Sequence, residues 1–286
     1  MPLQKLDLTW ALTAPLTQPD FVLPGLLPKT FGLIVAPGGT GKSMLALDLA
    51  ISLATGKSVA SGLFPAGPSG KAIFLAGEEN DHMLAHRLRS MVPGNELDNP
   101  ELNENLILLP MAGESCLLIS KDGKPTKLYE ELKAISVGAR LIIIDPLRRI
   151  HGGDENNSYE MTRFVVLMER LAKSTGAAVI ALHHANRSSQ DTGSQNASRG
   201  SSALVDGCRW QINLSRMDEK TAQMRSISDR DRHLYVAVDF AKTNYLESQP
   251  RMWLKRQPGG RLILDPLTNM PPVKPKKANP VDTTIL

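Results

Sequence analysis

A short glycine-rich stretch between an apolar run and an amphipathic run constrains the fold of this chain more than any other feature. The residues from Ala36 to Ser43 fit the pattern G-x-x-x-x-G-K-[ST], with alanine in the first glycine position. Glycines let backbone N–H groups curl round a triphosphate, the lysine reaches its phosphates, and the serine hydroxyl holds Mg²⁺. The candidate nucleotide-binding residues are Pro37, Gly38, Gly39, Thr40, Gly41, Lys42 and Ser43. A chance glycine-rich turn would not be expected between a strand and a helix.

Apolar runs recur along the first two hundred residues, each flanked by turn residues. Because they are continuous rather than alternating, they indicate strands buried on both faces, as in a parallel sheet. These runs are Phe31–Ala36, Lys71–Gly77, Leu106–Met111, Leu141–Asp145 and Ala177–His183. Between them, apolar residues at three- and four-residue spacing predict helices over Ser43–Leu53, Asp81–Met91, Thr126–Ser136 and Tyr159–Thr175. The alternation predicts an α/β domain with a mostly parallel sheet and helices on both faces.

The pattern changes after Gly200, where strands follow one another with few helices between them. The predicted strands are Trp210–Leu214, His233–Phe240, Met252–Arg256 and Leu262–Leu264. Such a series usually extends a sheet with antiparallel strands, and Pro258–Gly260 is a plausible turn between the last two. No linker separates a second domain. We therefore expect an N-terminal arm over residues 1–20, one domain over residues 21–268, and a flexible basic tail over residues 269–286.

Composition sets broad limits on the class of protein. A hydrophobic content of 42% and a charged content of 22% are ordinary for a soluble globular chain. Cys116 and Cys208 show no metal-ligand spacing, which argues against a zinc site and suits a reducing compartment. The start lacks a signal-peptide layout and no apolar run is long enough to span a bilayer, so we expect a cytoplasmic protein without membrane contact. The net charge of +4 favours nucleic acid only weakly.

Two groups of acids follow predicted strands. Leu141–Asp145 ends in a carboxylate at the sheet edge where open α/β folds bind ligands, so Asp145 would hold Mg²⁺ beside Ser43. The alternative is an acid that caps the turn before a proline. Because that proline occupies the next position, the general base is expected on the neighbouring strand, at Glu78 or Glu79. These acids could instead form a solvated cluster at the start of a helix.

Two histidines close the run Ala177–His183, and a polar stretch follows them. His183 or His184 could sense the γ-phosphate through a hydrogen bond, although histidines on apolar strands are often core residues. The stretch Ala185–Ser202 leaves the same sheet edge and carries donors suited to the phosphates of single-stranded nucleic acid. It could equally be a disordered surface loop, since it lacks aromatic residues on which bases would stack.

Further basic residues lie in the C-terminal third, at Arg209, Lys242, Arg251 and Arg256. An arginine or lysine offered to the nucleotide of a neighbouring subunit would couple hydrolysis around a ring. Each could also be a solvated surface charge, which is the usual fate of such residues. The block Asp229–His233 has charges of both signs and indicates a solvated turn.

The chain resembles the RepA-type hexameric replicative helicases of broad-host-range plasmids, a branch of the RecA-type P-loop ATPases. The resemblance covers about Phe21 to Leu264 and rests on VLPGLLPKTFGLIVAPGGTGKSMLALDLA, IIIDPLRRIH, VIALHHANR, ASRGSSALVDGCRWQ and FAKTNY, in that order. The fourth segment discriminates best, because a generic P-loop ATPase has no reason to contain it. Two departures are the Gly-Glu-Glu context of the acidic pair and the basic tail.

This resemblance implies an ATP- and Mg²⁺-dependent DNA helicase that forms a homohexameric ring round single-stranded DNA, with a replication initiator or a primase as a further partner. The implied roles are Lys42 and Ser43 for triphosphate and Mg²⁺, Glu78 as catalytic base, Asp145 as the acid of the second motif, His184 as γ-phosphate sensor, Arg209 as arginine finger in trans and Lys242 as a second trans-acting cation. Two other interpretations stay open: an ATP-switched DNA-binding or regulatory protein of the same fold, and a P-loop kinase of small molecules. The kinase lacks an evident lid and acceptor pocket.

Overall fold

The computed structural model describes residues 5–15, 18–58, 62–92, 99–184 and 202–270. Within these residues the strands form one nine-stranded sheet in the order β3-β2-β4-β5-β1-β6-β7-β8-β9. The strands are β1 (Phe31–Ala36), β2 (Ala72–Ala76), β3 (Leu106–Pro110), β4 (Leu141–Asp145), β5 (Ala178–His184), β6 (Trp210–Arg216), β7 (Tyr235–Thr243), β8 (Met252–Arg256) and β9 (Leu262–Leu264). The predicted strands are thus confirmed, with bounds that differ by at most three residues.

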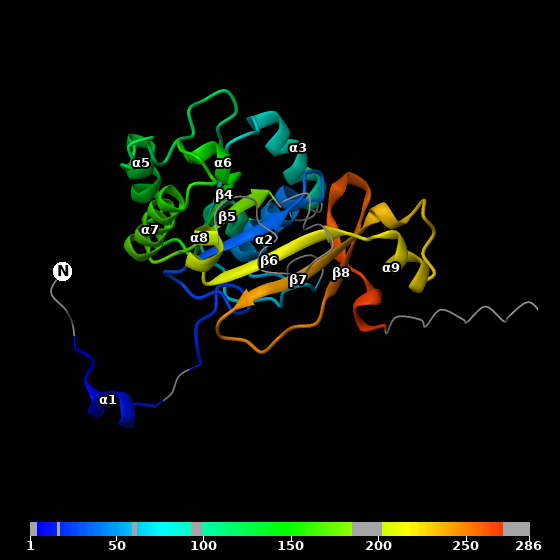
Figure 1. Ribbon diagram of the computed structural model, residues 1–286, viewed down its shortest axis with the longest axis horizontal. Coiled ribbons are helices and arrows are strands. Elements are labelled where there is room, and N and C mark those ends of the chain that lie inside the picture. Colours follow the sequence, from blue (N-terminus) through cyan, green and yellow to red (C-terminus); the bar gives the residue numbers. More distant parts are fainter. Residues whose placement is uncertain (1–4, 16–17, 59–61, 93–98, 185–201, 271–286) are drawn as a thin grey trace, which may run out of the picture.

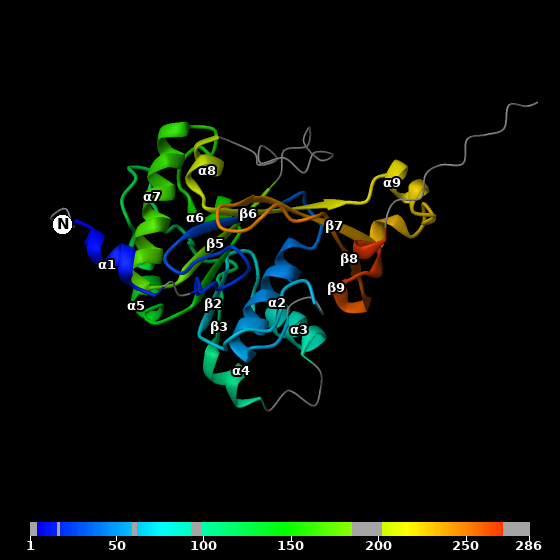
Figure 2. The same cartoon turned by 90° about the horizontal axis from the view of Figure 1, so that it is seen from below.

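Helices cover both faces of this sheet, as predicted (Figure 2). Helices α2 (Lys42–Thr55), α3 (Asp81–Met91) and α4 (Pro100–Asn105) lie on one side. Helices α5 (Lys127–Ile135), α6 (Leu147–Ile150), α7 (Ser158–Thr175) and α8 (Ser202–Gly207) lie on the other. Each strand of the sheet centre sends alternate residues to the two layers, so that Ile34 packs with α2 while Leu33 packs with α7. Burial on both faces explains the continuous apolar runs.

The C-terminal third extends the sheet, but the direction of its first strand differs from the expectation. Strand β6 pairs in parallel with β1, whereas β7, β8 and β9 follow in antiparallel register. The chain crosses over through α8 before it enters β6, which is why a parallel partner is reached. The predicted turn between β8 and β9 is present as the 3-10 segment η5 (Pro258–Gly260).

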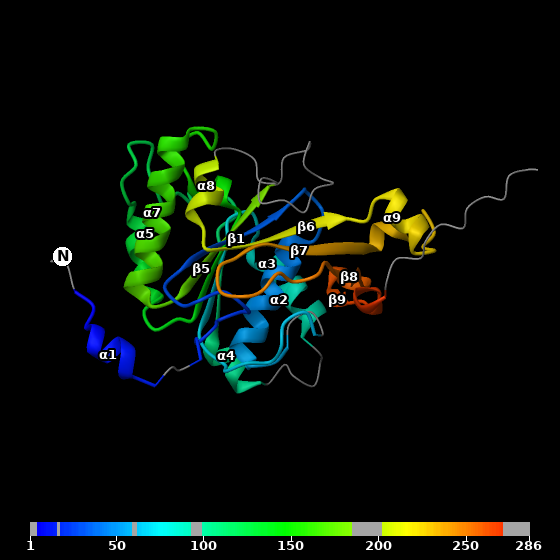
Figure 3. The same cartoon turned by 60° about the horizontal axis from the view of Figure 1, so that its bottom comes forward.

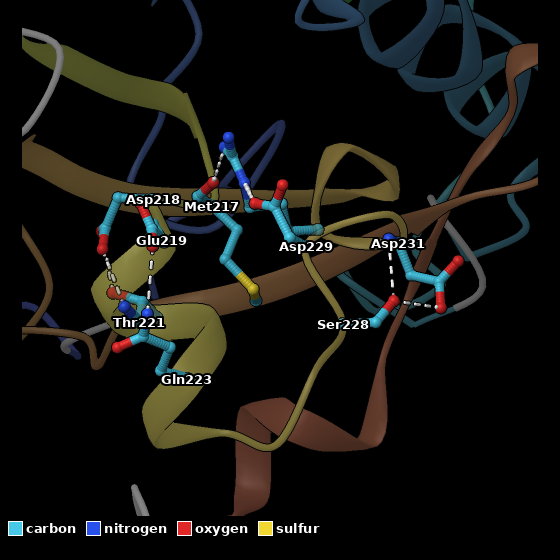
Figure 4. Close-up of polar contacts among 9 residues, drawn as sticks. Met217, Asp218, Glu219, Thr221, Gln223, Ser228, Asp229 and Asp231 are labelled. Atoms are coloured by element: carbon cyan, nitrogen blue, oxygen red, sulfur yellow. Dashed lines mark hydrogen bonds and ion pairs between the residues drawn. The ribbon is translucent and has the colours of Figure 1, made fainter.

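Between β6 and β7 the chain leaves the sheet and forms α9 (Glu219–Met224) and η4 (Arg232–Leu234), which lie at the end of the molecule away from α5 and α7 (Figure 1). Local polar contacts hold this segment. Asp218 caps α9 through Thr221, and the Ser228 hydroxyl donates to Asp231 at 2.7 Å (Figure 4). Asp229 pairs with Arg232 and most of the block is exposed, so the predicted solvated turn is confirmed.

The N-terminal arm carries a short helix that the sequence pattern did not predict, α1 (Leu8–Thr13), capped by Asp7. This helix lies apart from the sheet, with none of its residues buried (Figures 1 and 3). Asp20, the last residue of the predicted arm, forms an ion pair with Arg140 just before β4, with 2.7 Å between Nη2 and Oδ1. No helix among the described residues is long and apolar enough to cross a membrane. Most of the stretch Ala185–Ser202 and the tail from residue 271 lie outside the described residues.

Candidate functional site

Figure 3 shows the turn from β1 into α2, and the backbone angles of this turn suit a phosphate cradle. Gly39 and Gly41 have φ angles of 71° and 107°, in the left-handed region that favours glycine. Gly41 is also the N-cap of α2 and has no side chain to occupy the N–H groups of the first turn. These donors, together with the positive end of the helix dipole, suit an anion.

Lys42 is the first residue of α2, and its side chain is largely buried, with 7% of the residue exposed. Burial lowers its pKa, while the negative charges of Asp145 and Glu78 oppose that shift. The ammonium group therefore lies in a poorly solvated place between carboxylates, where a triphosphate would supply further negative charge.

Asp145 ends β4, next to the start of α2. Asp145 is only 9% exposed, and this burial raises the pKa of its carboxyl group. A hydrogen bond from the Ser43 hydroxyl and the charge of Lys42 act in the opposite direction and lower that pKa. A serine hydroxyl and a carboxylate side by side are hard oxygen donors of the kind that hold Mg²⁺ in nucleotide sites. The residues present therefore fit the metal that the sequence pattern implies.

The acidic pair after β2 arrives at the same edge because β2 and β4 are parallel neighbours, with Ala76 opposite Asp145. The two glutamates have different surroundings. Glu79 is half-buried and forms an ion pair with Arg87 of α3; burial raises its pKa, and the charges of Asp145 and Glu78 add to that effect. Glu78 is exposed, yet close enough to influence Lys42 and Asp145. Of the two glutamates, Glu78 is therefore the more accessible to water at this edge.

The two histidines lie in the strand next to the cradle. In the parallel register of β5 with β1, His183 is opposite Val35 and His184 is opposite Ala36, the last residue before the loop. His183 is 1% exposed and belongs to the core, while His184 is partly exposed at the strand end. Of the two, His184 is thus the one at the accessible strand end beside the loop.

Arg209 and Lys242 lie elsewhere. Arg209 immediately precedes β6, is exposed, and donates its backbone N–H to the Phe31 carbonyl at 2.9 Å, at the start of β1. The phosphate cradle follows the other end of β1, about 17 Å away at the rise of an extended strand. Lys242 is opposite Gln211 in the β6–β7 register, and its Nζ donates to the Val205 and Asp206 carbonyls of α8. The structure thus brings these two cations close to each other but not to the cradle of their own chain.

Two arginines that the sequence pattern does not place at the loop reach the cradle. The pattern predicts no role for Arg216, and it indicates Arg256 only as a possible cation for a neighbouring subunit. Arg216 Nη2 donates to the Gly38 carbonyl at 2.9 Å, and Arg256 Nη2 donates to the Thr40 carbonyl at 2.9 Å. Arg216 ends β6, so only the parallel direction of that strand could have indicated its position. Arg251, by contrast, pairs with Asp239.

Comparison with known proteins gives a family and a fold. A family model that describes an AAA domain matches residues 2–190. The fold is similar to that of a solved ATPase domain, at a TM-score of 0.56 and 16% identity over 82% of this chain and 84% of that one. It is also similar to a KaiC-like protein from the hyperthermophilic archaeon Pyrococcus horikoshii OT3, at a TM-score of 0.56 and 17% identity over 87% and 96% of the two chains.

A third similar structure is a DnaB-like replicative helicase, solved in a study of its interactions with primase. Its TM-score is 0.58 at 15% identity, over 82% of this chain and 57% of that chain. The present chain therefore spans little more than half of that protein. At such low identities these similarities show the fold alone, and the expected fold class, a RecA-type P-loop core with C-terminal antiparallel strands, is confirmed.

Proposed function

The chain belongs to the AAA domain family whose model it matches over residues 2–190, and on this premise we propose that it is an Mg²⁺-dependent ATPase with active sites shared between subunits of a ring. The observation that carries the proposal is the separation of two groups of residues. Lys42, Asp145 and Glu78 lie together at the carboxyl ends of the parallel strands. Arg209 and Lys242 lie at the opposite end, near the start of β1 and β6. A finger placed so far from its own cradle can reach only the cradle of another subunit.

Each residue has a distinct role in the proposed reaction. The backbone from Gly38 to Gly41 and the Lys42 ammonium bind the phosphates, and Ser43 with Asp145 would hold Mg²⁺, which neutralises phosphate charge when bound. Glu78 accepts a proton from water in line with the γ-phosphate, and the partly exposed His184 contacts that phosphate. Arg209, donated by a neighbour, stabilises the charge of the transition state.

We extend the proposal to DNA. The DnaB-like helicase of similar fold and the resemblance to RepA-type helicases support a homohexamer that translocates on single-stranded DNA during plasmid or mobile-element replication. A primase or a replication initiator is the further partner that this assignment favours. The proposed organisation keeps the arm over residues 1–20, the ATPase domain over residues 21–268 and the tail over residues 269–286.

Three measurements on the full chain test the proposal: ATP turnover with and without single-stranded DNA, displacement of one strand of a forked duplex, and the mass of the complex with nucleotide. We expect DNA to stimulate turnover, strands to separate in the presence of ATP, and the mass to correspond to a ring. Stimulated turnover without displacement would support instead the ATP-switched DNA-binding or regulatory protein. A monomer whose ATP turnover does not change when DNA is added would contradict both the helicase and the ATP-switched protein.

A further inference from the structure

Two arginine side chains from the C-terminal extension lie on the phosphate loop of their own chain. Arg216, at the end of β6, donates to the Gly38 carbonyl at 2.9 Å. Arg256, at the end of β8, donates to the Gly39 and Thr40 carbonyls at 3.2 and 2.9 Å. The loop therefore receives cations from two strands that are distant from it in sequence.

These guanidinium groups are also neighbours of each other. Burial and the nearby charge of Arg216 hold the pKa of Arg256 below its usual value. Among the described residues, neither arginine forms an ion pair with an acid. Their acceptors are neutral backbone carbonyls, which leave the repulsion between two like charges uncompensated.

Other arginines of the same extension have acidic partners or a structural role. Arg251, on β8, forms a two-point ion pair with Asp239, and Arg261 lies 3.7 Å from an Asp48 oxygen. Arg225 packs over Trp253 and donates to carbonyls at the end of the described chain. The pair at the loop differs from all three, because it combines two adjacent cations with the position where a polyanion is expected.

We propose that Arg216 and Arg256 form a cis guanidinium pair that binds the phosphate chain of the nucleotide held by the phosphate loop. The inference rests on the proposed function and adds two ligands to that site. A phosphate group offers charged oxygens that match the guanidinium fork, and such charge-assisted hydrogen bonds are stronger than those to carbonyls. Binding would move the side chains from the carbonyls of Gly38, Gly39 and Thr40 to the nucleotide and offset the repulsion between them.

The site also has room for this change. The guanidinium groups lie directly against the loop. A Cβ built at Gly39 would lie 2.9 Å from Arg216 Nη2, and one built at Gly41 would lie 3.4 Å from Arg256 Nη2. Arg216 and Gly38 are exposed, and Arg256 is partly exposed, so a short displacement of either side chain meets solvent rather than packed core. Lys42, by contrast, is buried, so the arginines are the more accessible cations at this loop.

The test compares ATP binding by the full-length wild type, Arg216→Gln, Arg256→Gln, the double variant and Lys255→Gln. The last variant is a matched control, because Lys255 neighbours Arg256 on β8 but lies over the Tyr235 ring. We expect each arginine substitution to raise the Kd for MgATP about tenfold, the scale of a hydrogen bond to a charged group. The double variant should also show a weaker dependence of Kd on salt, and Lys255→Gln should bind as the wild type does.

Thermal unfolding separates ligand binding from support of the loop. The expected result is an unchanged midpoint without nucleotide and a smaller rise of that midpoint on addition of ATP. A lowered midpoint without nucleotide, with the full rise retained, would assign the arginines to loop support and overturn the proposal. If Arg256→Gln does not fold, Arg256→Lys, which keeps the charge, should bind ATP better than Arg256→Met. Equal binding by these two variants would also overturn it.

The outcome also distinguishes this inference from the function on which it rests. If the wild type binds ATP, Lys42→Ala does not, and the double arginine variant keeps full affinity, only the guanidinium pair is wrong. If the wild type binds no ATP, the proposed ATPase itself is wrong.

Discussion

The two ends of β1 illustrate two ways of presenting charge. At its carboxyl end, Lys42 and Asp145 are buried and influence each other's pKa, and the Ser43 hydroxyl donates to Asp145. At its amino end, Arg209 is exposed beside the Phe31 carbonyl. Buried charges are already desolvated and oriented before a ligand arrives, whereas an exposed arginine loses its hydration only when a partner covers it.

Under the proposed function, one chain carries half of an active site at each end of the sheet. On that proposal the cradle takes an arginine finger in the transition state, which its own Arg209 cannot supply across the length of β1. A neighbouring copy could supply it, which makes oligomerisation part of catalysis rather than an addition to it.

The largest effect is expected at the buried end. Lys42→Ala removes the ammonium that we propose binds the phosphates, and we expect ATP turnover to fall to background with strongly weakened binding. Steady-state turnover and ATP titration measure both quantities. Lys127→Ala is the control, since that lysine is exposed on α5, and it should leave both unchanged. Retained turnover in Lys42→Ala would remove the loop from the active site.

Arg209→Ala should reduce turnover about 10³-fold, the scale of an arginine finger, while ATP affinity stays close to that of the wild type. Mixing supplies the sharper measurement. Rings that combine Arg209→Ala with Lys42→Ala subunits pair an intact cradle with an intact finger at some interfaces, so part of the activity should return. If mixing restores nothing although mixed rings form, the finger does not act in trans. Arg230→Ala is the control, because Arg230 is exposed in a turn, and it should leave turnover unchanged.

Glu78→Gln and Glu79→Gln compare two adjacent acids in unlike surroundings. Removal of a general base lowers turnover by about 10²- to 10⁴-fold, and we expect this loss for Glu78→Gln with ATP binding retained. Glu79→Gln should lower turnover less, because the Glu79 carboxylate is paired with Arg87. Single-turnover hydrolysis measures both. The reverse order would transfer the role of base to Glu79.

The smallest effect is expected at the ion pair of Asp20 with Arg140, at the amino end of β4. The hydrogen bond from Arg140 lowers the pKa of Asp20, so the folded state gains stability above the unfolded pKa and loses it as the pH falls through the folded value. Asp20→Asn should lower the free energy of unfolding by less than about 1 kcal/mol at neutral pH, because the pair is exposed to solvent. In strong acid the substitution should not change it. Chemical unfolding at both pH values measures this, and ATP affinity should not change. A constant cost at both pH values would contradict the electrostatic explanation.

Much of the core was predictable because its signals are local. A strand buried on both faces must be apolar throughout, so β1, β2, β4 and β5 were recognisable from composition alone. The short helices α1, α4, α6, α8 and α9 were not predicted, since six residues or fewer give less than two turns of periodicity. Their caps, such as Asp7 and Asn99, are single residues that also occur in turns.

The sequence by itself determined the phosphate loop, the acid that ends β4 and the pair of glutamates after β2, because each is a residue type at a fixed distance from a local pattern. Only the tertiary structure decided that β6 runs parallel to β1, that Arg209 lies at the end of β1 opposite its own cradle, and that Arg216 and Arg256 lie on that cradle. The contacts of Arg216 with Gly38 and of Arg256 with Gly39 join residues 178 and 217 positions apart. Such contacts depend on which strands pair and in which direction, and the free energy of that choice comes from packing across the whole sheet rather than from any short segment.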